Sequence, residues 1–174
     1  MLMGLITYFS RANTLEAVLL PAVISTVLAL RYAKEFKLSL LGPFVIGTAQ
    51  SIFLSTWWES GEALSLHVFP ACALMFVAMP SAWRPTWQVG YCLTFASLLL
   101  TDLVCTLRYS IDAGCLEFGF FCGVGGGGLK DALFWVPLWS AACLAGINLA
   151  TAWGGATVRI RLASLFTGPR RVFS

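Results

Sequence analysis

The chain has few charged residues, because lysine, arginine, aspartate and glutamate together make up 11% of its 174 residues. An ordinary soluble domain carries about 25% of such residues. Hydrophobic residues make up 59% of the chain, so apolar side chains must face lipid as well as one another. The scarcity of charge argues against a water-soluble protein and predicts one integral membrane domain over residues 1–174.

Several catalytic and binding motifs are also missing. The chain has one histidine and no Cys-x-x-Cys sequence, which disfavours a zinc site of the usual Cys/His type. No Ser/His/Asp or Cys/His nucleophile pattern is visible, so the sequence favours a role other than catalysis, and we expect no metal and no cofactor. A net charge of +3 without a recognisable motif argues against a nucleic-acid partner.

The charges that are present lie in clusters and leave apolar windows between them. Each window is close to the ~20 residues that an α-helix needs to cross the ~30 Å hydrocarbon core. None alternates with the period of two that is typical of a barrel strand. The sequence therefore predicts an all-α, polytopic transmembrane helical bundle with a basic C-terminal tail (154–174). Its five expected spans lie near residues 14–32, 38–58, 63–80, 86–107 and 132–153.

Lysine and arginine in short loops predict the orientation, because these residues are retained on the cytoplasmic side. The loop after the first expected span carries Arg31, Lys34 and Lys37. The loop after the second carries Glu59 and Glu62 but no lysine or arginine. Alternation of the spans then places the C-terminus in the cytoplasm and the N-terminus outside.

A glycine-rich loop, within the stretch FFCGVGGGGLKDALFW, precedes the last expected span. One interpretation is a turn followed by a helix start, because an aspartate is favoured at a helix N-terminus. The other is a hinge or permeation element, because consecutive glycines expose backbone N–H groups and permit a break in the helix. The candidate residues for this second role are Gly125, Gly126, Gly127, Gly128, Lys130 and Asp131.

The sequence GVGGGGLKDAL, residues 123–133, resembles the Gly-Gly-Gly-x-x-Arg-Asp pattern of the trimeric intracellular cation channel family, with Lys130 in the place of the arginine. In that family the glycines break a transmembrane helix and line a cation path, so the resemblance implies such a path here. The resemblance covers these residues alone. The chain shows neither that family's number of spans nor its repeated triple-helix unit.

Polar residues inside the expected spans are candidates for function, because they are costly in lipid. Asp102 lies in LLLTDLVCTL, where a charge costs ~3 kcal/mol on insertion scales. We expect it to face the bundle interior or to stay protonated, with Thr101 and Thr106 close enough to hydrogen-bond locally. It would either hold helices together or carry protons or cations. Gln50 and Asn148 are expected to form interhelical hydrogen bonds.

An acid/base group could form from Glu59, Glu62 and His67, with Asp102 as a further member. Such a group could protonate a lipophilic substrate. On a continuous helix, however, His67 would lie about 140° round from Glu62. The spacing therefore does not require an enzyme.

Cys115 and Cys122 lie in the loop that the charge pattern places outside. In an oxidising compartment they would close a small disulfide loop. The other four cysteines lie in or beside apolar windows, where a thiol packs as a small hydrophobic group.

The sequence leaves three functions open. The first is a channel, a holin-like lesion former or a transporter component for ions or small solutes. The second is a non-catalytic accessory subunit or scaffold of a larger membrane assembly, and the third is a membrane-embedded acid/base enzyme. In each case the expected partners are the lipid bilayer and further copies of the chain or other membrane proteins.

Overall fold

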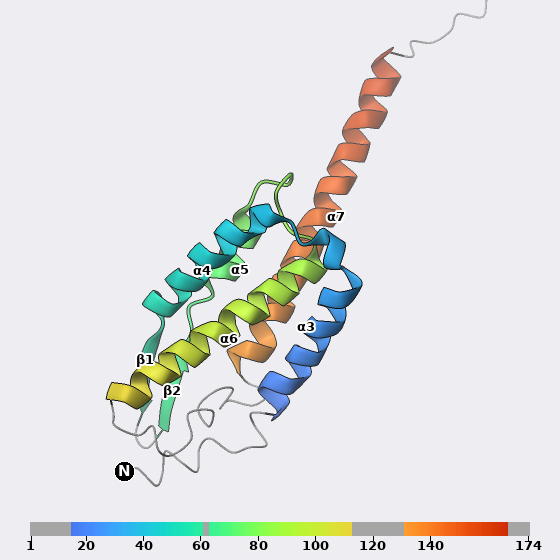
Figure 1. The fold of residues 1–174 in the computed structure, drawn as a ribbon. Helices are drawn as coiled ribbons and strands as arrows, with labels where there is room; N and C mark the ends of the chain where they lie inside the picture. The colour runs from blue at the N-terminus through green and yellow to red at the C-terminus, as the bar shows by residue number, and fades with distance from the viewer. Residues whose placement is uncertain (1–14, 61–62, 113–130, 167–174) are drawn as a thin grey trace, which may run out of the picture.

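The computed structural model describes residues 15–60, 63–112 and 131–166, which are mostly helical (Figure 1). The helical class agrees with the all-α prediction, to which the structure adds one two-stranded hairpin. The described elements are the π-helical η1 (Leu15–Leu19), α3 (Leu20–Arg31), the short 3-10 helices η2 (Ala33–Glu35) and η3 (Leu38–Leu40), α4 (Leu41–Leu54), β1 (Thr56–Ser60), β2 (Ala63–His67), α5 (Ala71–Ala78), α6 (Trp87–Asp112) and α7 (Ala132–Phe166).

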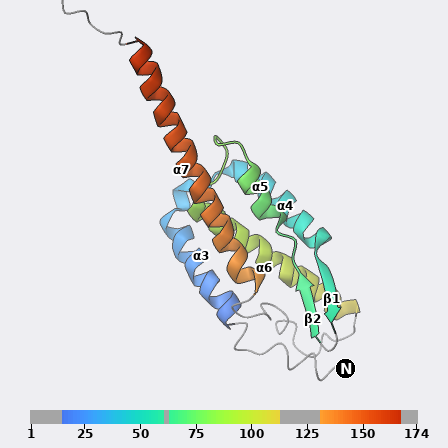
Figure 2. The same cartoon turned by 180° about the vertical axis from the view of Figure 1, so that it is seen from behind.

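Helix α6 lies at the centre of the bundle and contacts α3, α4, α5 and α7. In Figure 1, α3 lies on one side of α6, and α4 and α5 lie on the other. The view from behind shows α7 running along α6 and then extending well beyond the other helices (Figure 2). The remaining described helices are therefore held together through α6.

Two connections lie at the same end of the bundle. The hydroxyl of Thr86 donates to a carboxylate oxygen of Glu35 at 2.6 Å, which joins the α3–α4 connection to the α5–α6 connection. The hairpin lies at the other end, where the rings of Trp57 and Tyr109 are 4.9 Å apart. The segment 63–80 therefore still passes from one end of the bundle to the other.

That segment is not the continuous helix that hydropathy predicts for 63–80. Its first part is strand β2, which pairs antiparallel with β1 so that Thr56 faces His67 and Ser60 faces Ala63. The tryptophans after Thr56 favour this outcome, because β-branched and aromatic residues fit a pleated strand. The same strand shortens the second predicted span (38–58), since α4 ends at Leu54.

The helical part of this segment, α5, has only eight residues. Pro70 precedes it and Pro80 follows it. Proline has no backbone N–H and biases the residue before it away from the helical conformation, as seen at Met79, where ψ is 144°. At 1.5 Å per residue, α5 is about 12 Å long, and it cannot cross a bilayer as a helix alone.

Two serines, one inside α4 and one at its C-terminus, bind the backbone where the helical path is interrupted. The amide of Phe69 donates to Ser55 Oγ at 3.1 Å, and the amide of Ala71 donates to Ser51 Oγ at 3.2 Å. Both amides lie beside the start of α5, where intrahelical partners are lacking. The two serines therefore provide hydrogen-bond acceptors for backbone amides at the point where the helix is interrupted.

Among the described helices, two are both long and apolar enough to cross a membrane, as judged by length and composition. They are Trp87–Tyr109 and Ala132–Gly154, each of 23 residues with a mean hydropathy of 1.6. The apolar helical stretches Ala17–Arg31 and Leu38–Leu54 are shorter.

Close packing fixes α5 against its neighbours. Its Cys72 and Phe76 form one apolar cluster with Leu40, Val89 and Leu144. A second cluster contains Phe95, Leu98 and Leu133, with Val68 of the broken segment packed against it. Val68, Cys72 and Phe76 therefore anchor the interrupted segment to the core, while Phe69 and Leu74 of the same segment are exposed.

Candidate functional site

Polar side chains are buried along the helix interfaces and form what we call the polar seam. Helix α6 supplies most of it, and Thr94, Ser97 and Thr101 follow one another at spacings of three and four residues, which places them on one face. The seam consists of Thr48, Ser51, Thr94, Ser97, Thr101, Asp102, Thr106 and Ser140.

Hydroxyl groups of the seam connect three helices. Thr48 Oγ1 of α4 donates to Ser97 Oγ at 2.9 Å. Thr94 Oγ1 and Ser140 Oγ of α7 are 3.1 Å apart and share a hydrogen bond in which either can be the donor. Because a hydroxyl both donates and accepts, the direction of these bonds can reverse without moving a helix.

Asp102 is the one carboxylic acid of the seam, and 5% of its surface is exposed. It lies about 22 Å along α6 from Trp87 and about 15 Å from the end of the helix, at 1.5 Å per residue. Thr106 Oγ1 lies 3.5 Å from Asp102 Oδ1. The structure therefore places Asp102 in the interior of the bundle, as the sequence predicts, with Thr106 beside it.

The outer surface is apolar where a water-soluble protein would be polar. Leu30, Leu38 and Phe53 are 77%, 85% and 87% exposed. The exposed large hydrophobic residues come from η1, α3, α4, α5, α6 and α7, as well as from connections between them. Large apolar side chains thus face outward as well as inward, and hydroxyls and one carboxyl are buried beside the apolar clusters.

Several predicted site residues lie outside the described part of the chain. They are Glu62, Cys115, Cys122, Gly125, Gly126, Gly127, Gly128 and Lys130. Asp131 is described, and its Oδ1 accepts a hydrogen bond from the amide of Leu133 at 2.9 Å. Because this amide belongs to the first turn of α7, Asp131 caps the helix.

The hairpin separates two members of the predicted acid/base group. Glu59 pairs with Leu64, whereas His67 pairs with Thr56, three positions further along the ladder. At ~3.4 Å per residue the two backbone positions lie about 10 Å apart. The strand register therefore does not bring Glu59 and His67 together, and Asp102 belongs to the seam between the helices.

The sequence predicts the buried positions of Asp102, Thr101 and Thr106 but not the other members of the seam. For Thr94 and Ser97, the available signal is the helical spacing of hydroxyl residues within the apolar segment of α6. The predicted interhelical donors behave differently from each other: Gln50 is exposed, while Asn148 Nδ2 donates to the carbonyl of Pro85 at 3.4 Å.

Comparison with protein families, with curated proteins and with solved structures finds no match to this chain. Within residues 15–60, 63–112 and 131–166, no group of three or more His, Cys, Asp or Glu side chains is arranged to hold a metal ion. The seam and the apolar surface around it are therefore the features of the described residues that bear on function.

Proposed function

We propose that this chain is a multispanning integral membrane protein that carries protons or small cations along the polar seam, as a channel or transporter component. The observation that carries the proposal is a buried carboxyl, Asp102 of α6, in a bundle whose surface exposes large apolar residues such as Leu30 and Phe53. An ionisable residue within a membrane-spanning helix is by default a functional candidate, because its cost must be offset.

The contacts of the seam favour a relay over a wide pore. Four of its hydroxyls bond directly to one another, in the pairs Thr48–Ser97 and Thr94–Ser140. From Thr94 to Thr106 the seam extends about 18 Å along α6, more than half of the ~30 Å hydrocarbon thickness. Buried groups that both donate and accept, spaced along one helix, suit protons or small cations better than large solutes.

The broken segment 63–80 supports a transport role. In transporters, discontinuous membrane segments line the substrate path, because their ends leave backbone groups for polar contacts. Here the amide of Ala71 binds Ser51, a seam residue with no exposed surface. The break and the seam therefore meet at Ser51.

The orientation proposed from the sequence fits this arrangement. The two connections joined by Thr86 and Glu35 carry Arg31, Lys34 and Arg84, and they lie at one end of the bundle. We place this end in the cytoplasm, with the C-terminus, and the hairpin end outside. The five passes then consist of four helical segments and the interrupted segment 63–80.

Proton flux in liposomes tests the proposal. The purified full chain is reconstituted with a pH-sensitive dye inside, and a potassium gradient with valinomycin sets the voltage. We expect flux from the wild type and its loss in Asp102→Asn. The matched control is Asp112→Asn, which removes a carboxylate from an exposed position on the same helix and should retain flux. Absence of wild-type flux at every voltage and pH would refute a transport role.

A second candidate is an accessory subunit, and the surface of α7 favours it. Only 28% of the span window of α7 is buried, against 67% for α6. Ala142, Gly146 and Ala150 are exposed and lie four residues apart, a spacing that permits close helix contact. A Cβ at Gly146 meets nothing within 4 Å, so Gly146→Ile should leave the chain folded but abolish association in detergent if this face binds another copy.

A further inference from the structure

An apolar groove lies at the end of the bundle that carries the α3–α4 connection. It has a volume of about 320 Å³, at the lower end of the ~300–1,000 Å³ range of ligand sites. Its lining consists of Phe36, Lys37, Leu38, Leu40, Leu41, Phe44 and Leu93. Six of these seven side chains are apolar, so the groove suits a hydrocarbon chain.

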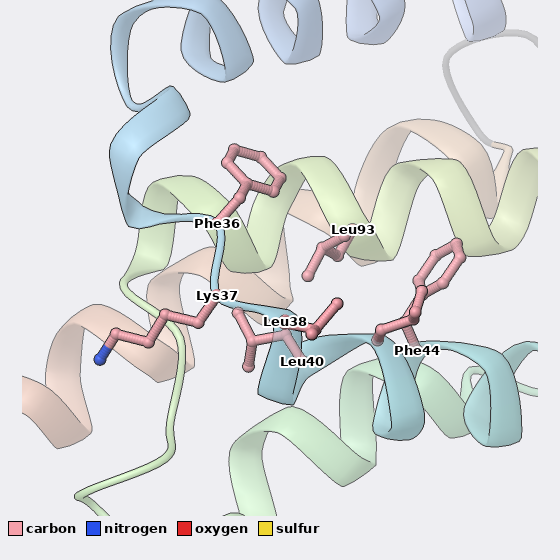
Figure 3. A pocket seen from close by; sticks show the side chains of 7 residues that line it. Phe36, Lys37, Leu38, Leu40, Phe44 and Leu93 are labelled. Atoms are coloured by element: carbon pink, nitrogen blue, oxygen red, sulfur yellow. The ribbon is translucent and has the colours of Figure 1, made fainter.

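Lys37 gives the groove a charged end. Figure 3 shows its side chain directed away from Phe44 and Leu93, with Nζ outside the apolar lining. Lys37 is exposed, and no carboxylate within the described ranges forms an ion pair with it. The nearby Glu35 accepts a hydrogen bond from Thr86 on the neighbouring connection.

Other cations make this end positive. Arg31 and Lys34 lie on or beside the same connection. Arg84 of the neighbouring connection donates through Nη2 to the carbonyl of Met79 at 2.7 Å, while its Nε and Nη1 are buried without an acceptor among the described residues. Met79 packs against the cluster that contains Leu40, a residue of the groove. These cations therefore lie at the same end of the bundle as the groove.

We propose that the groove binds an acyl chain of an anionic membrane phospholipid, whose headgroup lies at Lys37. This inference rests on the proposed membrane location, which puts the basic connections at the level of the headgroups. Exposed Phe36 and Leu41 on the lining open the groove toward the surrounding lipid. The ammonium group complements the phosphate, and the apolar lining excludes water from the hydrocarbon chain.

Photo-crosslinking tests this site. The full chain is reconstituted in phosphatidylcholine vesicles that contain a small fraction of phosphatidylglycerol with a diazirine on its acyl chain. After illumination, mass spectrometry maps the modified residues, which should be concentrated at Phe36, Phe44 and Leu93. Since one lysine near a membrane surface contributes ~1 kcal/mol, Lys37→Gln should lower labelling of the groove about fivefold.

Lys34→Gln is the matched control, because it removes one charge from the same exposed connection but does not line the groove. It should leave labelling of the groove unchanged. Equal losses in both variants, or equal labelling by the corresponding phosphatidylcholine probe, would overturn the lipid site. Flotation of the vesicles after carbonate treatment reports insertion independently: a chain that does not float would overturn the membrane location as well.

Discussion

Replacement of Gly47 by alanine should weaken the interface between α4 and α5. A Cβ at Gly47 would lie 2.6 Å from Cys72 Cα and 3.0 Å from the Cys72 amide nitrogen. Because the obstructing atoms are backbone, the two helices must move apart. Overpacking of this kind costs about 1–3 kcal/mol.

Gly146→Ala supplies the matched control, since this helical glycine has nothing within 4 Å of an added Cβ. Both substitutions gain up to about 1 kcal/mol of helix propensity. The difference in unfolding free energy between the two variants therefore isolates the clash at Cys72. Gly42→Ala is a second control within α4 itself, because Gly42 is exposed and its added Cβ also has nothing within 4 Å.

The assay is an SDS titration of the purified protein in mixed micelles, followed by circular dichroism. Alkylation of Cys72, which is 2% exposed, gives a local readout when its peptide is resolved by mass spectrometry. Gly47→Ala should lower the midpoint and accelerate alkylation, whereas Gly146→Ala should do neither. Equal midpoints with Cys72 equally protected would refute the proposed close contact.

Three further predictions address the seam, a helix start and the orientation. A double-mutant cycle of Thr94→Val and Ser140→Ala should give a coupling of about 0.6 kcal/mol, the average for interhelical hydrogen bonds in a membrane, and zero coupling would contradict the α6–α7 bond. Asp131→Ala should lower the unfolding free energy by about 1 kcal/mol and Asp131→Asn by less, because asparagine also caps a helix. A reporter that functions only in the cytoplasm should be active beside Lys34 and inactive beside Glu59, and the reverse pattern would contradict the orientation.

The long helices were the easiest elements to predict. The expected spans 86–107 and 132–153 correspond to α6 and α7, because charged residues lie at both ends of each apolar window. Hydropathy measures transfer to lipid rather than backbone conformation, so it could not indicate that α7 continues to Phe166 or that the segment 63–80 contains a strand. The sequence signal for the interrupted helix was the pair of prolines at positions 70 and 80.

The candidate site was predictable only in part. Asp102 stands out because a carboxyl in an apolar segment is costly. Thr48, Ser51 and Ser140 do not, because a serine or threonine hydroxyl can bond to a carbonyl of its own helix at little cost, as Thr101 does to Ser97 at 2.8 Å. Their grouping depends on how α4 and α7 pack against α6, which local sequence does not specify.

Replacement of Asp102 by leucine distinguishes a carboxyl that is needed for transport from one that is needed for the stability of the fold. If Asp102 serves transport, the fold tolerates its burial as a cost, and Asp102→Leu should raise the SDS midpoint while proton flux is lost. Replacing a buried ion pair with apolar side chains of similar volume is often neutral or stabilising by about 1–4 kcal/mol, and removal of the buried Asp102 carboxyl should act in the same direction. If the carboxyl instead holds α6 in place through contacts other than its bond within the helix to Thr106, the midpoint should fall. Asp102→Asn keeps the shape and a hydrogen-bonding group, so it should abolish flux with little change in the midpoint. A fall in the midpoint for both variants would assign Asp102 a structural role and favour the accessory subunit.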